Sequence, residues 1–234
     1  MSMVLTENTG KMFEYAFCRA VNISYNGIYR YEEPSEDLLY RLFPFTYTDW
    51  VHTAAGGSRF DMTEVGNENN HLSLKTTKKD GKVAPQVIGQ PSINKFCELI
   101  GIESLSKSQL KNHIQSNISD ILPIFEEYTF DCPILYYNEK TNQIKYIQKL
   151  EKIKWSDYEY SWTNDWSQTK SSTLRVHKPD KTNNNNTNNN NNTIKKISIC
   201  EIQFHDSSRT NMANRWYFEN VLKAFPNNFD ITEL

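Results

Sequence analysis

Two short strand-like segments joined by a turn-forming run constrain this chain more than any other feature. The stretch from Arg59 to Thr76 reads RFDMTEVGNENNHLSLKT. RFDMTEV and HLSLKTT alternate apolar and polar residues as strands do, and the Gly- and Asn-rich run between them favours a turn. The pattern predicts two neighbouring strands, with Asp61 on the first and Lys75 at the end of the second. Charged residues in such places are poor core material, but they suit a metal ion and a water molecule.

The spacing of these residues favours phosphodiester chemistry. Strand alternation places Ser73 and Lys75 on one face and Leu74 on the other, and Asp61 on the adjoining strand can reach the same edge. A carboxylate can hold Mg²⁺, which prefers oxygen ligands and keeps several waters. The metal polarises a phosphoryl oxygen and lowers the pKa of a bound water, while a lysine neutralises charge in the transition state.

The remaining chain alternates helical and strand-like segments. Helices are expected in TGKMFEYAFCRAVN, with Thr9 or Asn8 as its cap, SEDLLYRLFPF, the stretch from about Ser92 to Gly101, SKSQLKNHIQSNISDILPIFEEY and NRWYFENVLKAF. Strands are expected in the hairpin CPILYYN and QIKYIQKL, and in YSWTNDWSQ, STLRVHK and TIKKISICEIQFH. YTDWVHTAAGGS is less regular, with a turn at Gly56-Gly57. This order predicts a mixed α/β fold.

Length and composition limit the class of protein. With 234 residues, we expect a single domain over residues 1–234. The net charge of -2 excludes a histone-like basic binder but permits a local basic cleft. No apolar run approaches the roughly 18 residues of a membrane span, and no secretory pattern opens the chain. The four cysteines form no CxxC pair, which argues against a zinc site of that type and for reduced thiols in the cytoplasm.

One low-complexity segment, Thr182–Thr193, reads TNNNNTNNNNNT. Asparagine favours turns by bonding to its own backbone, and such a run cannot bury apolar surface. Because strand-like sequence lies on both sides, the run is expected to be a flexible loop that interrupts a hairpin and does not separate two domains.

GGSRFDM and LSLKT, preceded by a helix that carries Glu14, resemble the core of the PD-(D/E)xK nuclease superfamily, especially type II restriction endonucleases. The resemblance covers roughly residues 11–90. It implies a central mixed β-sheet flanked by helices, with a catalytic core at about 11–100 and a DNA-recognition part at about 130–225. It also implies that Asp61 binds the metal, Lys75 is the catalytic lysine, Leu74 offers its backbone carbonyl to the metal, and Glu14 supports the metal site.

Ser73 departs from the family pattern, because Asp or Glu usually stands at this position. A second carboxylate could come from Glu64, Glu14 or Glu98, and the number of metal ions stays open. Gln86 resembles a glutamine that some members carry after the lysine strand. With fewer carboxylates, the site is expected to bind Mg²⁺ more weakly.

Polar and basic side chains near the site and in the C-terminal half are candidates for DNA contacts. Lysines hold phosphates, and Arg, Asn and Gln also read base edges. The residues expected to contact DNA are Lys78, Lys79, Lys82, Gln86, Gln90, Arg175, Lys178, Arg209, Asn211, Asn214 and Arg215. Ordinary solvated loops and strand polarity remain the alternative for each. Trp162, Trp166 and Trp216 are expected in the core and not stacked on bases.

The resemblance implies a Mg²⁺-dependent endonuclease that cleaves double-stranded DNA at specific sequences and leaves a 5′ phosphate. Many relatives are homodimers that read palindromic sites, so a homodimer is expected. Three alternatives stay open: a less specific repair, viral or mobile-element nuclease, a DNA-binding module that lost cleavage, and an interaction protein in which Asp61 and Lys75 form only a surface salt bridge. A nuclease based on His205 is disfavoured, because no second histidine stands nearby at metal-ligand spacing.

Overall fold

The computed structural model describes residues 6–28, 33–54, 58–78, 81–166, 169–179, 194–205 and 212–234. Its α-helices are α1 (Thr6–Ala20), α2 (Glu36–Leu42), α3 (Ile93–Leu99), α4 (Lys107–Ser116), α5 (Ile118–Phe130) and α6 (Phe218–Ala224). Short 3₁₀ helices cover Phe43–Tyr47, Trp155–Asp157 and Pro226–Asn228. None of the helices in these ranges combines the length and the apolar character needed to cross a membrane.

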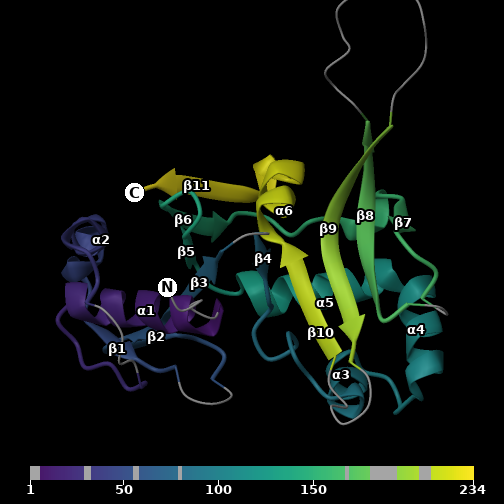
Figure 1. The fold of residues 1–234 in the computed structure, drawn as a ribbon, viewed down its shortest axis with the longest axis horizontal. Helices are drawn as coiled ribbons and strands as arrows, with labels where there is room; N and C mark the ends of the chain where they lie inside the picture. Colours follow the sequence, from purple (N-terminus) through teal and green to yellow (C-terminus); the bar gives the residue numbers. More distant parts are fainter. Residues whose placement is uncertain are drawn as a thin grey trace, which may run out of the picture.

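Two β-sheets stand beside each other (Figure 1). The first has the order β1-β2-β3-β5-β6-β11, with bounds Trp50–His52, Met62–Glu64, Asn67–Thr77, Ile134–Asn138, Gln143–Lys149 and Phe229–Glu233. The second has the order β4-β10-β9-β8-β7, with bounds Lys82–Val83, Met212–Tyr217, Ile194–Phe204, Ser171–Pro179 and Tyr160–Trp162. The predicted α/β class, with a mixed sheet flanked by helices, is confirmed, but the second sheet was not predicted.

The first sheet is mixed because β3 and β5 run parallel, from Ser73 opposite Ile134 to Thr77 opposite Asn138. Parallel neighbours need a long crossover connection, and α3, α4 and α5 lie in this one. Both faces of β5 are covered: Leu135 packs in the cluster beneath α1, and Tyr136 packs in the cluster of the opposite face. The side chains of β3 also alternate between these two faces. α1 therefore covers one face of the first sheet, and the candidate catalytic side chains of β3 lie on the other face.

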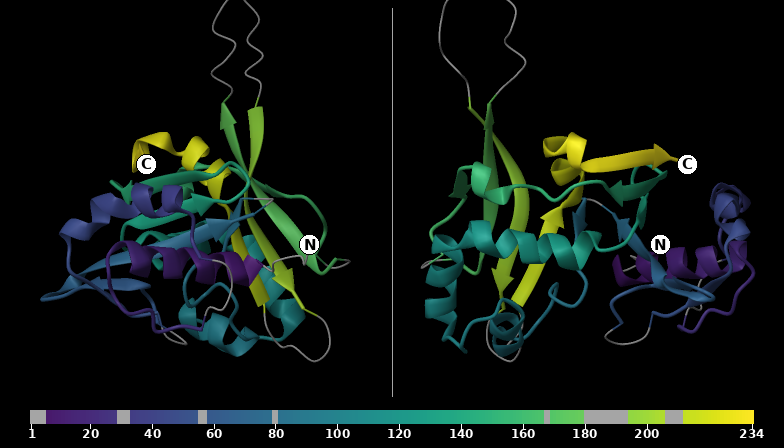
Figure 2. Two further views of the ribbon diagram at one scale, coloured as in Figure 1. Left: turned by 60° about the vertical axis from the view of Figure 1, so that its left-hand side comes forward. Right: turned by 180° about the vertical axis from the view of Figure 1, so that it is seen from behind.

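The second sheet is antiparallel in every described pair, and α5 covers its inner face, as the views in Figure 2 show. The ring of Phe125 meets that of Trp216 edge-on at 6.0 Å, and Trp216 Nε1 donates to Thr129 Oγ1 at 2.8 Å. Residues from both sheets share one buried cluster that includes Tyr136 and Leu174. The sheets are therefore held together by common apolar packing.

Some predicted boundaries are wrong. α1 begins at Thr6, so Thr9 lies inside the helix and donates to Glu139 at 2.8 Å instead of capping it. The irregular segment YTDWVH contains strand β1. The long amphipathic segment forms two helices, α4 and α5, which meet at Asn117.

The last predicted helix is half strand. Asn214 and Trp216 point inward while Arg215 is more exposed, which is the alternation of a strand, and the helix begins only at Phe218. β11 was not predicted. β8 and β9 pair as far as Pro179 opposite Ile194, so the Asn-rich run does interrupt a hairpin. The run itself lies outside the described residues, as does Gly56-Gly57.

Candidate active site

Asp61 connects β2 to β3 through its side chain. The residue lies one position before β2 and not within the strand as predicted. The turn between β2 and β3 is shorter than predicted, because β3 already begins at Asn67. One carboxylate oxygen, Oδ2, accepts from the backbone N–H of Leu74 at 2.7 Å and from Ser73 Oγ at 3.0 Å. Lys75 Nζ lies 3.8 Å from the same oxygen. The structure therefore brings together the three residues that the sequence places on this edge.

The backbone of Asp61 is also held. Its carbonyl oxygen accepts from Thr53 N at 2.9 Å and from Ala54 N at 3.2 Å, just beyond β1. These bonds tie the residue to β1 on one side while its carboxylate bonds to β3 on the other. The aspartate is thus fixed at the point where β2 and β3 cease to pair.

Gln86 joins this group from the loop after β4. Its Nε2 donates to Ser73 Oγ at 3.2 Å and lies 3.4 Å from Asp61 Oδ2. Its backbone N–H donates to Tyr128 O at 3.0 Å, at the end of α5. Asp61, Ser73, Lys75 and Gln86 form what we call the acidic-edge cluster. In this conformation the Gln86 side-chain amide bonds within the protein.

The cluster is largely withdrawn from solvent. The side chains of Lys75 and Asp61 are 10% and 14% exposed. The alternative of an ordinary surface salt bridge does not describe such a pair, because charges at low exposure are screened weakly. A cation and an anion kept in this setting act strongly on any charged group that enters.

Glu14 lies on the other face. Its Oε2 is 3.5 Å from Nε2 of the buried His52, whose Nδ1 accepts from Asn26 N at 3.0 Å. The Leu74 side chain packs in the cluster beneath α1, so only its backbone lies at the acidic edge. Among the described contacts, none joins Glu14 to the acidic-edge cluster.

The other candidate carboxylates also lie apart from Asp61 in their contacts. Glu64 accepts from Asn67 and Asn70, and Glu98 pairs with Lys95 on α3. Over the described ranges, no group of three or more His, Cys, Asp or Glu is arranged to hold a metal ion. Mg²⁺ is commonly held by one or two carboxylates, with waters and substrate phosphates as its other ligands. Asp61, whose carboxylate is oriented by Ser73 and Gln86, offers such an ion one carboxylate, and the other ligands would come from the backbone, waters and the substrate.

Two neighbours of the site were missed from the sequence. Arg59 bonds to Asp131, lies 3.6 Å from Glu127 and stacks on the Tyr128 ring at 4.9 Å, which joins the Asp61 segment to α5. Burial raises the pKa of the Cys132 thiol to about 12, with Asp131 adding to the rise and Lys75 opposing it. No local signal announces either residue, because their partners are distant in sequence.

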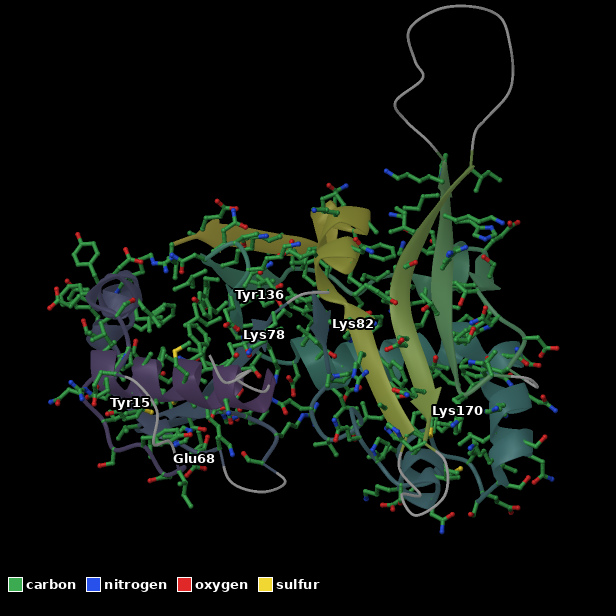
Figure 3. All side chains as sticks on the ribbon, in the orientation of Figure 1. Tyr15, Glu68, Lys78, Lys82, Tyr136 and Lys170 are labelled. Carbon is green, nitrogen blue, oxygen red and sulfur yellow. The ribbon has the colours of Figure 1, made fainter. Side chains whose placement is uncertain are left out.

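The outer face of the second sheet carries several of the predicted DNA contacts. Lys82 and Arg215 both approach Glu201, at 3.4 and 3.5 Å. Lys82 also lies 5.0 Å from the centre of the Tyr217 ring. Arg175 is half-buried on β8. Lys78 lies 3.8 Å from Glu139. Figure 3 labels both Lys78 and Lys82.

Other predicted contacts are placed differently. Asn214 is fully buried, and its amide donates to Ile88 O at 2.7 Å, so it offers no surface to a ligand in this conformation. Lys178 bonds to Ala224 O and lies over the Phe225 ring at 4.2 Å. Gln90 is exposed. Lys79, Arg209 and Asn211 lie outside the described residues.

The chain is similar to a type II restriction enzyme. It is 37% identical over 240 residues to the type II restriction enzyme CviAII of Paramecium bursaria Chlorella virus 1, across 99% of this chain. The chain spans 64% of the length of that relative. No protein-family model and no solved structure matches it.

Proposed function

We propose that this chain is a Mg²⁺-dependent endonuclease that hydrolyses phosphodiester bonds in double-stranded DNA at specific sequences, as a type II restriction enzyme does. The convergence of Asp61, Ser73, Lys75 and Gln86 at one largely buried edge carries the proposal. The similarity to CviAII along nearly the whole chain supports it. PD-(D/E)xK membership is part of the proposal, with Ser73 in place of the usual acidic residue.

Asp61 is proposed to hold Mg²⁺ together with the Leu74 carbonyl. A bound magnesium ion polarises a phosphoryl oxygen and lowers the pKa of a water. Ser73 and Gln86 restrict the orientation of the Asp61 carboxylate through the hydrogen bonds described above. Because the Ser73 hydroxyl is neutral, the site carries less negative charge, and weaker Mg²⁺ binding than in members with two carboxylates is expected.

Lys75 is proposed to neutralise charge on the scissile phosphate and to orient the attacking water. Its ammonium is held 3.8 Å from Asp61 Oδ2 and is only 10% exposed, so its field is weakly screened. A fixed cation costs little reorganisation when charge develops in the transition state. Glu14 lies beside His52 on the opposite face of the sheet, so the proposed metal site does not include it.

The predicted DNA contacts and the homodimer belong to the same proposal. A two-fold protein reads a two-fold site. Sedimentation of the protein alone and with a short palindromic duplex tests the oligomeric state. A dimer in either sample supports this part, and a monomer in both contradicts it without affecting the proposal for the acidic edge.

The first test uses a long, sequence-diverse duplex DNA incubated with the purified protein, in Mg²⁺ and in EDTA. Discrete fragments in Mg²⁺ only, with 5′ phosphates at their ends, are the expected result. A metal-dependent smear would indicate the less specific nuclease. Cleavage that persists in EDTA would contradict the proposal.

A DNA-binding module without catalysis is the second candidate, and Ser73 is the residue that favours it. Such a module would bind duplex DNA with an affinity that falls steeply as salt rises, because lysines and arginines release counterions from phosphates. It would leave the DNA intact in Mg²⁺ and in Mn²⁺. Binding measured at two salt concentrations, beside the cleavage assay, separates the two candidates.

A further inference from the structure

The loop between β4 and α3, residues 84–91, physically joins the second sheet to the acidic-edge cluster. On the side of β10, Asn214 Nδ2 donates to Ile88 O at 2.7 Å, Asn214 N donates to Gly89 O at 2.8 Å, and Met212 N donates to Pro91 O at 2.9 Å. At its other end the loop carries Gln86 into the cluster. One short segment thus bonds to both regions.

The loop is held in a strained shape. Val87, between Gln86 and Ile88, has a φ of 56°, in the left-handed region that a β-branched residue rarely enters. Such strain persists only when the surrounding structure enforces it. At Gly89, an added Cβ would overlap the carbonyl oxygen of Pro85. A small change at the Ile88 end should therefore move Gln86.

Asn214 is the side chain that holds the Ile88 end. It is fully buried, and its Oδ1 has no hydrogen-bond partner among the described residues. An apolar residue at this position would avoid the free-energy cost of burying an unpaired oxygen. The hydrogen bond that the amide nitrogen donates therefore best explains the presence of asparagine. The next residue, Arg215, lies at the surface beside Glu201. One face of β10 therefore contacts the loop, and its opposite face carries a residue proposed to contact DNA.

We propose that Asn214 is a positioning residue that holds Gln86 at Asp61 and Ser73, so that the placement of β10 sets the geometry of the acidic edge. This proposal rests on the proposed nuclease function for its catalytic consequence. It assigns to Asn214 a role inside the protein instead of a contact with DNA. It also provides a path by which binding on the outer face of β10 can alter cleavage.

The kinetic test is a double-mutant cycle with Asn214→Ala and Gln86→Ala. Each single variant is expected to lower kcat about tenfold and to leave KM within about twofold, because both disturb the same group after DNA has bound. The double variant should be no slower than the slower single variant, since residues that act as a unit are not additive. A hundredfold loss in the double variant, or an unchanged kcat in Asn214→Ala, would overturn the proposal.

Asn220→Ala is the matched control. Asn220 Nδ2 donates to the carbonyl oxygen of Ser198 at 2.9 Å, which is also an amide-to-backbone bond onto the second sheet, but it does not touch the loop. Its loss should reduce stability to a similar degree and leave kcat close to that of the parent. A fall in kcat equal to that of Asn214→Ala would mean that general destabilisation explains both, and would overturn the proposal.

A readout without DNA separates this inference from the nuclease function. Amide hydrogen exchange at Gln86, whose N–H bonds to Tyr128 O, should quicken in Asn214→Ala and not in Asn220→Ala. Exchange at Gln86 that stays slow in a folded Asn214→Ala would contradict the link even if the parent cleaves DNA. A parent protein that fails to cleave would refute the function, and exchange would still decide the link.

Val87→Gly in the Asn214→Ala background is the rescue variant. Glycine adopts a positive φ without steric cost, so the loop can keep its shape without the Asn214 bond. About a threefold recovery of kcat, with slower exchange at Gln86, is expected. No recovery in either measurement would count against the proposal. If Asn214→Ala does not fold, Asn214→Leu, which removes the amide donor and keeps a similar side-chain volume, replaces it in the same comparisons.

Discussion

A single oxygen, Oδ2 of Asp61, receives the hydrogen bonds of Ser73 and Leu74 and lies near the ammonium of Lys75. In the proposed mechanism the same carboxylate binds the magnesium ion. Its present partners offset much of its charge, which lets it persist at low exposure. A metal ion would compete with Lys75 for this oxygen, so the two cations are expected to separate when the site is loaded.

Replacing Asp61 or Lys75 by alanine should abolish most cleavage. Each change removes a charge that acts on the reacting phosphate, so a loss of at least about a hundredfold in kcat is expected. DNA binding measured in Ca²⁺ should change much less. Ser73→Ala should cost less than either, because a neutral hydroxyl is removed.

Glu98→Ala is the control for these variants. Glu98 is an exposed acid on α3 that pairs only with nearby Lys95 among its described ion pairs, and its removal should leave the rate unchanged. Cleavage that survives in both Asp61→Ala and Lys75→Ala would refute the site. An unchanged rate in Ser73→Ala would mean that Ser73 only fills space.

Cys132 should react slowly with thiol reagents despite lying at the site. Its pKa is raised to about 12 from 9.0, chiefly by burial, so its thiolate fraction at about pH 8 is lower by about a thousandfold than that of a free cysteine. Peptide mass spectrometry after timed alkylation measures the rate. Urea-unfolded protein is the control and should be modified quickly; equally rapid labelling of the native protein would contradict the expectation.

At the scale of the elements, α5 organises the segment that follows β6. Glu126 is buried on α5 and accepts from Ile153 N at 3.2 Å and from Trp155 Nε1 at 2.6 Å. Lys149 Nζ lies 3.5 Å away and balances the charge. Trp155 in turn stacks on Trp216 of β10, with ring centres 5.8 Å apart. One carboxylate thus connects a helix, a connecting segment and the second sheet.

Glu126→Ala should destabilise the fold strongly, by about 3 kcal/mol, because it leaves buried donors and the Lys149 ammonium without their partner. Urea denaturation monitored by Trp fluorescence gives the free energy of unfolding. Glu127→Ala, one residue along and with a side chain 67% exposed, should cost less than about 1 kcal/mol. Equal losses of unfolding free energy in the two variants would show that the buried hydrogen bonds of Glu126 contribute no more than the exposed side chain of Glu127.

At the scale of the whole molecule, the buried core contains titratable groups: Tyr136 and Cys200 lie in the cluster that the two sheets share, and Cys18 lies in the cluster beneath α1. Burial raises the pKa of Cys18 from 9.0 and of Tyr136 from 10.0, each to about 12, and raises that of Cys200 further. The folded state therefore keeps these protons at pH values where the unfolded chain has released them. Stability then falls as pH rises, because the unfolded state binds fewer protons.

The protein should show a nearly constant Tm between about pH 7 and about pH 8 and a falling Tm from about pH 9 towards about pH 12, the window set by these shifts. Thermal melts followed by circular dichroism across this range check the expectation. Cys18→Ala removes one of the raised thiols, so its curve should fall less steeply. A Tm that stays level or rises above about pH 9 would contradict it.

Local patterns anticipated the elements whose signal lies within a few residues. The hairpin of β5 and β6 and the helix α3 follow from the periodicity of their residues. β10 was misassigned because Trp216, Tyr217 and Phe218 are compatible with either period, and only pairing with β9 decides between them. β1 is three residues long, too short for a period to be seen.

The sequence by itself determined the hairpin that carries Asp61, Ser73 and Lys75, because strand alternation is local and sends Ser73 and Lys75 to the same face. Only the tertiary structure decided that Gln86 joins them and that Asn214 turns into the core. Those placements depend on bonds between residues far apart in the chain, Gln86 to Ser73 and Asn214 to Ile88, which no local pattern encodes. Glu14 shows the same limit: its helix was predictable, but packing placed it opposite His52 and away from the acidic edge.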